Sequence, residues 1–241
     1  MNKAIIAIDS FKGCLTSEEA GSAVMEGIKT IFPDCETLLF PIADGGEGML
    51  DVLISATQGK YRTLPAHGPL MELIQAQYGI SGDGQTALIE MAAISGLPLV
   101  PEEKRNPMLT TTYGTGELIL DALEQGCRRF IVGIGGSATN DAGLGMLQAL
   151  GFRFLDKRGN LLGTGGKIMS QVASIDTSAV HPALKETRFT IACDVHNPFC
   201  GSDGAAYIFA PQKGADARMV KELEAGMQAL SQVIRSATGK D

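Results

Sequence analysis

The residue types and spacing best suited to chemistry lie in the segment 129–145, which reads RFIVGIGGSATNDAGLG. An apolar, β-prone run leads into residues 135–141, hereafter the glycine turn, and a helical pattern follows from Leu144. A strand, a glycine-rich turn and a helix in this order aim free backbone N–H groups and a positive helix end at an anion. Glycine lets the backbone approach a phosphate without a Cβ in the way. We therefore predict an anion site at Gly135, Gly136, Ser137, Asn140 and Asp141.

Five further clusters place an acid or a lysine after a predicted strand or turn. Taken singly, each cluster, like the glycine turn itself, could be no more than a capped turn. An α/β fold gathers its ligands at such strand ends, so six clusters in one chain favour a shared cleft. Phosphoryl transfer uses these groups: backbone N–H groups for phosphate, a lysine for charge, and carboxylates for Mg²⁺. The five clusters are Asp9-x-x-Lys12-Gly13, Asp44-Gly-Gly-Glu47, Gly114-x-Gly116-Glu117, Asp194–Asn197 and Gln212-Lys213-Gly214.

Three residues are predicted to act in catalysis or charge neutralisation. Lys12, just before a predicted helix, is expected to contact a phosphate or a carboxylate; a solvated surface lysine is the alternative. Asp194 ends a predicted strand, and we expect it to act as a general base or a metal ligand. Lys213, in the sequence PQKG, is a second candidate for neutralising developing charge.

The metal is expected in the acidic glycine-rich loop. Asp44 and Glu47 are predicted to hold Mg²⁺ or the substrate hydroxyls, although acids at a helix start could equally be caps. Asn197 is expected to contact phosphate or substrate, with an Asx turn before the next proline as the alternative. The pattern C-x₂-H-x₃-C at 193–200 offers three of the four ligands of a structural zinc, so zinc is not predicted.

Composition limits the class of protein. The chain has 241 residues, a net charge of −7, 44% hydrophobic residues, 5% aromatic residues and 30 glycines. These values favour an α/β protein with many tight turns, and without a basic stripe we expect no nucleic-acid partner. The apolar run at 4–8 is too short for a signal peptide or a membrane span. Five cysteines without a CxxC pair indicate reduced thiols, and hence a cytoplasmic protein without a membrane partner.

Alternating strand and helix patterns position these clusters. A shift to β-prone pieces separated by turns, beginning near residue 60, indicates an antiparallel set and a domain boundary. Thr16 and Glu19 match a capping box at the start of the first helix. The predicted strands are 3–9, 36–41, 60–64, 73–80, 86–90, 129–134 and 187–193, and the predicted helices are 16–31, one from 49, 115–125, one from 144 and 218–234.

Two other functions are compatible with parts of the sequence. Gly133-x-Gly135-x-x-Ala138 fits the dinucleotide fingerprint of an NAD(P)-dependent dehydrogenase, with Asp156 as the ribose-binding acid. The fingerprint lies in mid-chain behind an antiparallel stretch, however, and would leave the other clusters without a role. A non-catalytic binding module is the third candidate.

Six blocks of the sequence together resemble the bacterial glycerate kinase family. The resemblance covers essentially the whole chain in the right order, with small departures at Cys14, Met49 and Ala142. It implies ATP- and Mg²⁺-dependent phosphorylation of D-glycerate, with 2-phosphoglycerate as the favoured product. The blocks are DSFKG (9–13), ADGGEG (43–48), TTYGTGE (111–117), GIGGSATNDAG (133–143), CDVHNPFCGSDGAA (193–206) and FAPQKGA (209–215).

The same resemblance implies two unlike α/β domains with a cleft between them. Residues 1–60 would begin a discontinuous, Rossmann-like or flavodoxin-like domain with a parallel sheet, and residues 61–215 would form an inserted domain with a mixed sheet. Residues 216–241 would return toward the first domain. Family members continue well beyond this endpoint, so the chain resembles a truncated glycerate kinase with an incomplete first sheet. We therefore also expect self-association through that sheet.

Overall fold

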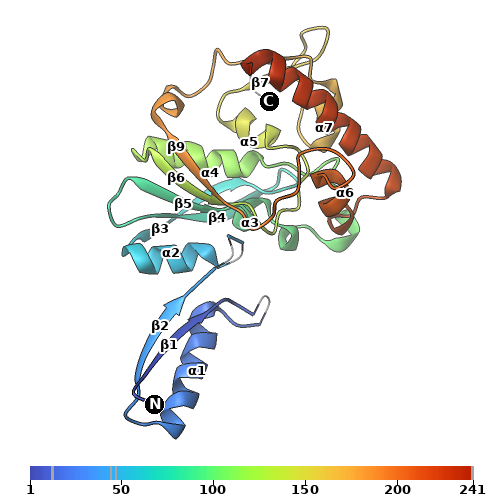
Figure 1. Cartoon of the computed structure of the whole chain (residues 1–241). Helices are drawn as coiled ribbons and strands as arrows, with labels where there is room; N and C mark the ends of the chain where they lie inside the picture. The colour runs from blue at the N-terminus through green and yellow to red at the C-terminus, as the bar shows by residue number, and fades with distance from the viewer. Residues whose placement is uncertain (12–13, 44, 47, 240–241) are drawn as a thin grey trace.

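The computed structural model describes residues 1–11, 14–43, 45–46 and 48–239. A small unit of two strands and one helix extends from a larger body that holds the remaining elements (Figure 1). We call residues 3–41 the first unit and residues 49–238 the second unit. The mixture of parallel and antiparallel strands with helices confirms the expected α/β class.

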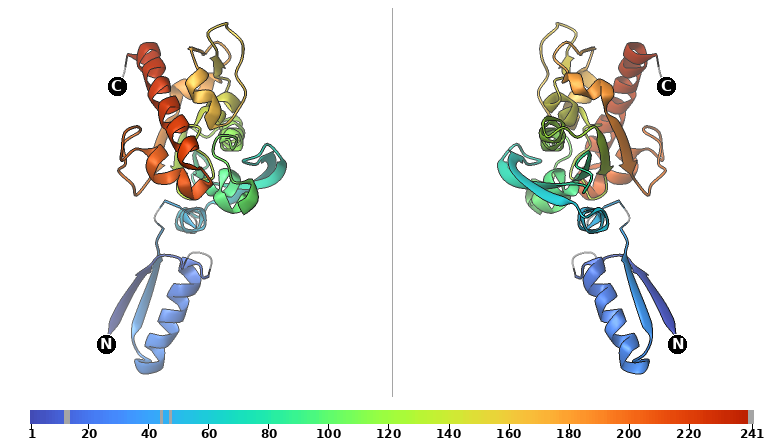
Figure 2. Two further views of the ribbon diagram at one scale, coloured as in Figure 1. Left: turned by 90° about the vertical axis from the view of Figure 1, so that its right-hand side faces the viewer. Right: turned by 90° about the vertical axis from the view of Figure 1, so that its left-hand side faces the viewer.

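The first unit is a single β–α–β element. Strands β1 (Lys3–Ile8) and β2 (Glu36–Pro41) pair in parallel, and helix α1 (Ser17–Ile31) connects them. The predicted capping box is present: Thr16 Oγ1 accepts from the backbone N–H of Glu19 at 3.2 Å, and the Thr16 N–H donates to the Glu19 carboxylate at 2.8 Å. Helix α1 covers one face of the strand pair and leaves the other open (Figure 2).

The second unit is built on a five-stranded sheet. Its strand order is β3-β4-β5-β6-β9, antiparallel from β3 to β5 and parallel from β5 to β9. Two successive antiparallel pairings make β3 run in the direction of β5. The carboxyl ends of β3, β5, β6 and β9 therefore share one edge of the sheet. The strands are β3 (Lys60–His67), β4 (Leu73–Ile80), β5 (Thr86–Glu90), β6 (Arg129–Gly133) and β9 (Arg188–Ala192).

Helices cover both faces of this sheet. Helix α2 (Met49–Thr57) packs Leu50 and Ile54 on one face against Leu88 of β5. Helix α4 (Tyr113–Glu124) covers the opposite face, where alternate strand residues such as Ile89 and Phe130 are buried. The period-two alternation along β5 thus supplies two separate cores. Figure 1 shows the resulting layers, with α2 and α4 on either side of the sheet.

An outer layer packs beyond α4 and forms a third core around Phe154, Met169 and Leu223. Helix α7 (Ala217–Thr238) supplies one wall of it, starting at the N-cap Asp216 and ending at Gly239 with φ +69°. The other elements are α3 (Ala92–Ser95), α5 (Leu144–Ala149), α6 (Ala205–Phe209), strands β7 (Arg153–Leu155) and β8 (Ser174–Asp176), and the 3₁₀ helices η1 (Leu97–Leu99), η2 (Glu102–Lys104), η3 (Gly166–Gln171), η4 (Pro182–Glu186) and η5 (Pro211–Lys213).

Two placements differ from the expected domain boundaries. Helix α2 packs on the second sheet, although the boundary was expected after it at residue 60. Helix α7 was expected to return toward the first domain, but its buried side packs on η3 and α6 of the second unit, away from β1 and β2 (Figures 1 and 2). Each helix packs its apolar face against an apolar surface of the second unit.

Among the described residues, no helix combines the length and apolarity that crossing a membrane requires.

Candidate functional site at the sheet edge

The predicted clusters meet at the carboxyl edge of β6 and β9. Strand β6 runs into the glycine turn, and β9 runs into the loop that begins with Asp194. The backbone of Gly45 and Gly46 lies against both strand ends. A Cβ at Gly45 would lie 2.9 Å from the Ala192 carbonyl oxygen, and one at Gly135 would lie 2.9 Å from Gly46 Cα. Loops separated by 89 and 147 residues thus share one edge, as expected for ligand-binding ends of strands.

Glu90 ties the start of α2 to this edge. Its side chain, at the end of β5, is 7% exposed and accepts from the N–H of Gly48 at 2.9 Å and of Leu50 at 3.3 Å. A carboxylate at a helix start is favoured by the helix dipole and satisfies N–H groups that lack partners. Glu90 was not among the residues predicted from the sequence. Its signal was an acid at the end of an otherwise apolar strand, where a buried charge needs partners.

The glycine turn is held by neighbouring backbone. The Ala138 N–H donates to the Ser95 carbonyl at 2.8 Å, and the Gly136 carbonyl accepts from the Leu97 N–H at 2.8 Å. Gly136 is exposed with φ +71°, a conformation that favours glycine. Gly135 was expected to give room to a phosphate, but the atoms that approach it belong to Gly46. The accessible part of the turn is therefore at Gly136 and Ser137.

Asp141 is buried and its oxygens are occupied by protein donors. It is 1% exposed; Oδ2 accepts from the Thr112 N–H and hydroxyl at 2.8 and 2.9 Å and from the Gly145 N–H at 3.2 Å. Oδ1 accepts from the Gly143 N–H at 3.1 Å. The carboxylate thus joins the starts of α4 and α5, a structural role in place of the expected ligand contact. Asn140 is 8% exposed and also points inward, with Nδ2 3.6 Å from Met227 Sδ.

Lys213 points at the glycine turn from η5. Its Nζ donates to Ser137 Oγ at 2.8 Å and to the Thr139 carbonyl at 2.5 Å. Burial lowers the pKa of Lys213 from 10.5 to about 8, although the nearby Asp141 carboxylate opposes this shift. The predicted partners of a ligand, Lys213 and Ser137, are therefore partners of each other.

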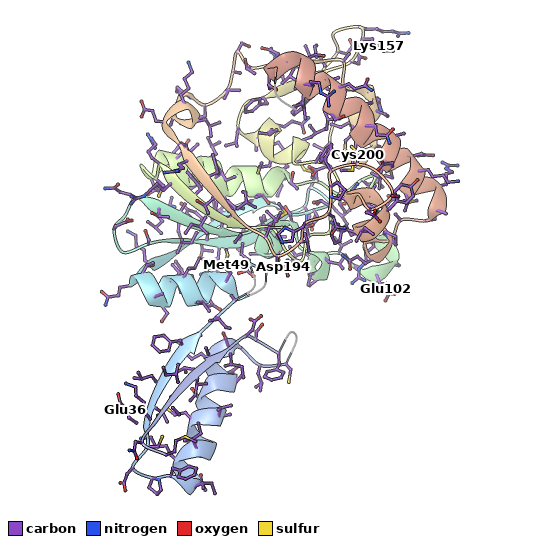
Figure 3. The ribbon with its side chains drawn as sticks, in the orientation of Figure 1. Glu36, Met49, Glu102, Lys157, Asp194 and Cys200 are labelled. Atoms are coloured by element: carbon purple, nitrogen blue, oxygen red, sulfur yellow. The ribbon has the colours of Figure 1, made fainter. Side chains whose placement is uncertain are left out.

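Asp194 lies in the loop after β9 (Figure 3) and is exposed. Within the described residues its carboxylate accepts no hydrogen bond. Asn197 is exposed too, but its Nδ2 donates to the Asp203 carbonyl at 2.9 Å and so shapes the same loop. In the described part of the chain, no three His, Cys, Asp or Glu side chains gather closely enough to hold a metal ion.

A cavity lies between the first unit and helix α2. Its volume is about 820 Å³, and it is bounded by Ser10, Ser17 and Pro41 of the first unit, by Gly48 just before α2, and by Asp51 of α2. Its volume is in the range of small-molecule sites. Gly48 lines it and also donates its N–H to Glu90, so the cavity reaches the start of α2. The predicted sites Lys12, Asp44 and Glu47 lie outside the described residues.

The TTYGTGE cluster is used in packing. Glu117 accepts from the His67 N–H at 2.7 Å and pairs with His67 Nδ1 at 2.8 Å. A Cβ on Gly114 or Gly116 would collide with the carbonyls of His67 and Met146. The two glycines and the acid thus allow α4 to pack closely against β3 and α5. This cluster therefore has a structural role, as in the alternative given above.

The dinucleotide alternative is contradicted by topology. A Rossmann fingerprint requires the strand after the turn and helix to join the same parallel sheet. Strand β7, which follows α5, instead pairs antiparallel with β8 in a separate two-stranded sheet. Asp156 accepts from the N–H groups of Arg158 and Asn160, both at 2.8 Å, and so closes its own turn.

The fold and site define a two-unit α/β protein with glycine-rich loops and a lysine at the carboxyl edge of parallel strands. The chain belongs to the glycerate kinase family, whose sequence model matches residues 4–241. It is 50% identical to the glycerate kinase of Haemophilus influenzae over 238 residues, which cover 99% of this chain and 63% of the relative. It is also 50% identical over 239 residues to the glycerate 2-kinase of Escherichia coli, with the same coverage.

A solved structure agrees with this assignment. The crystal structure of a putative glycerate kinase 2 from Salmonella typhimurium LT2 matches with a TM-score of 0.90 and 44% sequence identity. The match covers 100% of this chain and 64% of that one. The chain therefore spans a little under two thirds of the length of these relatives.

Proposed function

We propose that the chain catalyses, or contributes the site for, transfer of the γ-phosphoryl group of ATP to a hydroxyl of D-glycerate. The observation behind this proposal is the meeting of the glycine turn, the Gly45–Gly46 backbone and the Asp194 loop at one sheet edge. Phosphoryl transfer depends mainly on positioning and on stabilising charge, which glycine-rich backbone and a nearby cation supply. The names of the relatives give glycerate as the substrate, and the D form follows from the family resemblance.

The described residues suggest a division of roles. The exposed backbone of Gly136 and the Ser137 hydroxyl would bind a phosphate or the glycerate carboxylate, while Asp194 would accept the proton of the substrate hydroxyl. Asn197 would act through the shape of the Asp194 loop. Lys12 remains our candidate for a direct contact with a phosphate or a carboxylate.

Mg²⁺ is the expected partner of ATP. Magnesium bound with a nucleotide keeps water and phosphate ligands and needs only one or two protein carboxylates. Asp194 is available at the edge, and Asp44 and Glu47 belong to the loop whose glycines pack there. These acids suit a hard cation. When bound, it would neutralise charge on the phosphates.

We propose 2-phosphoglycerate as the product, in line with the name of the Escherichia coli relative. We also propose that the open face of the first unit, with Ile5 66% and Phe40 53% exposed, is covered in the longer relatives by further strands and helices. That arrangement would give the Rossmann-like first domain that the family resemblance implies, with the second unit inserted in it. Alternatively, a second copy of the chain would cover this open face.

The test is a coupled assay of ADP release by the 241-residue chain with Mg-ATP and D-glycerate, with ³¹P NMR to identify the product. Asp194→Asn should lower kcat at least about 100-fold, because it removes the proton acceptor without changing the shape. Asp203→Asn, in the same exposed loop, is the matched control and should leave kcat unchanged. Calorimetry with each ligand separates binding from turnover. Failure to bind Mg-ATP and D-glycerate would contradict the proposal.

A further inference from the structure

Lys213 is an unusual buried cation. It is 7% exposed, whereas lysine is rarely buried without partners. Its backbone is fixed on both sides, since its N–H donates to the Ala210 carbonyl at 3.0 Å and the chain leaves through Gly214 with φ +92°. A Cβ at Gly214 would collide with the Arg105 carbonyl, so this exit requires glycine. The side chain is thereby directed at the glycine turn.

The contacts of Lys213 leave it little capacity for a ligand. A lysine ammonium has three N–H donors and no acceptor. Two of the three donate to Ser137 Oγ and to the Thr139 carbonyl, 76 and 74 residues away in sequence. A direct contact with phosphate could use only the third N–H, in a residue that is 7% exposed.

The contact with Lys213 orients the hydroxyl group of Ser137. A hydroxyl is one donor and two acceptors, so an oxygen that accepts from Lys213 must donate its own hydrogen elsewhere. Within the described residues, Ser137 Oγ makes no second hydrogen bond. Ser137 is half-buried and adjoins the exposed Gly136, so an acceptor can reach it from the open side of the turn.

We propose that Lys213 is a positioning residue that clamps the glycine turn and turns the Ser137 hydroxyl hydrogen toward an oxygen of a bound anion. The anion is a phosphate of ATP or the carboxylate of glycerate, so this inference rests on the proposed function. The positive charge of Lys213 lies 2.8 Å from the Ser137 oxygen. It adds to the attraction for the anion because a buried charge is poorly screened by solvent and salt. Asp141, itself tied to α4 and α5, keeps the charge from being isolated.

The test is a double-mutant cycle on ligand affinity. Lys213→Met, Ser137→Ala and the double variant are titrated by calorimetry, separately with Mg-ATP and with D-glycerate, which shows which of the two anions the turn binds. Each single change should weaken binding of one ligand about 10-fold, as expected for a hydrogen bond to a charged group. The double variant should also lose about 10-fold, because Lys213 acts through Ser137. Ser137→Thr, which retains a hydroxyl, should restore binding.

Lys185→Met is the matched control. Lys185 also lies in the last turn of a 3₁₀ helix that begins with proline, but it is exposed. This change should leave both affinities unchanged. If circular dichroism shows that Lys213→Met does not fold, the pKa of the Lys213 ammonium is measured instead by NMR in the wild type, with and without the anion. The bound anion should then raise the pKa of Lys213.

The outcomes separate the two proposals. A wild-type chain that binds neither ligand overturns the proposed function and this inference together. Three outcomes overturn this inference alone, provided that the wild type binds. They are a loss of about 100-fold in the double variant, unchanged affinity in Lys213→Met, and no change in the pKa of Lys213 when the anion binds.

Discussion

Two β–α–β elements in this molecule, β1–α1–β2 and β5–α4–β6, have the same parallel connectivity but very different surroundings. In the first unit, α1 covers one face of two strands, and the buried helix residues are only Ser17, Ala20 and Gly21. In the second, α4 buries Leu118, Ile119 and Leu123 and the sheet has a further helix on its other face. The comparison indicates that neighbouring strands and cover on both faces, rather than the β–α–β element itself, supply most of the stability.

The largest expected difference compares two phenylalanines on strands. Phe130→Ala in β6, where the ring is 1% exposed, should lower the free energy of unfolding by about 3–5 kcal/mol. Phe40→Ala in β2, where the ring is 53% exposed, should change it by less than about 0.5 kcal/mol. Urea unfolding of the two variants measures both values. A large loss at Phe40 would show that the open face of the first unit is covered in solution.

The buried lysine should give stability an unusual pH dependence. Because burial lowers the pKa of Lys213 from 10.5 to about 8, the unfolded chain binds more protons between these values. Stability should therefore rise as pH rises from about 8 to 10.5, by on the order of 3 kcal/mol relative to Lys213→Met. Over the same range anion affinity should fall, as the positive charge is lost. Unfolding curves and titrations at several pH values test these opposite trends, and parallel trends would contradict them.

Two tyrosines with the same kind of partner give a smaller contrast. Tyr78, fully buried, donates to Asp121 at 2.6 Å, and Tyr61, 44% exposed beside the cavity, donates to Asp51 at 2.7 Å. Arg62 and Tyr78 hold the pKa of Asp121 below its usual range, so Asp121 is charged. Tyr78→Phe therefore removes a hydrogen bond to a charged group and should lower the free energy of unfolding by about 1.5–3 kcal/mol. Tyr61→Phe should cost less than about 1 kcal/mol. Equal losses in thermal unfolding would show that burial does not decide the effect.

The smallest contrast compares two helix caps. Thr16→Ala removes the capping box of α1, and Asp216→Ala removes the N-cap of α7, whose carboxylate accepts from Arg218 and Met219 at 2.9 and 2.8 Å. Each should cost about 1 kcal/mol. In hydrogen exchange, Thr16→Ala should lower protection only within α1. Asp216→Ala should lower it throughout the core around Phe154, Met169 and Leu223, because α7 forms part of that core. Loss of protection beyond α1 in Thr16→Ala would show that the units unfold together.

Local patterns predicted the elements well. The capping pair at Thr16, the alternation along 86–90 and the apolar spacing of 218–234 place α1, β5 and α7 within a few residues of their observed bounds. These signals succeed because they depend on residues three or four apart, or alternating, in the chain.

The roles within the candidate site were less predictable. Asp141 and Lys213 were expected to face a ligand, but their partners are Thr112 and Ser137. Gly135 gives room to Gly46. A carboxylate, a lysine or a glycine has the same sequence signature whether a ligand or another part of the chain occupies its partner positions.

The sequence by itself determined the α/β class, the order of the elements and the family, since these follow from short-range periodicity and from long motifs that match over 4–241. Only the tertiary structure decided that α2 packs on the second sheet, that Glu90 binds the start of α2 and that Lys213 supports the glycine turn. These contacts join residues between 34 and 76 positions apart. They arise because buried charges and apolar stripes must each find complementary partners, and packing in three dimensions alone selects which partners are within reach.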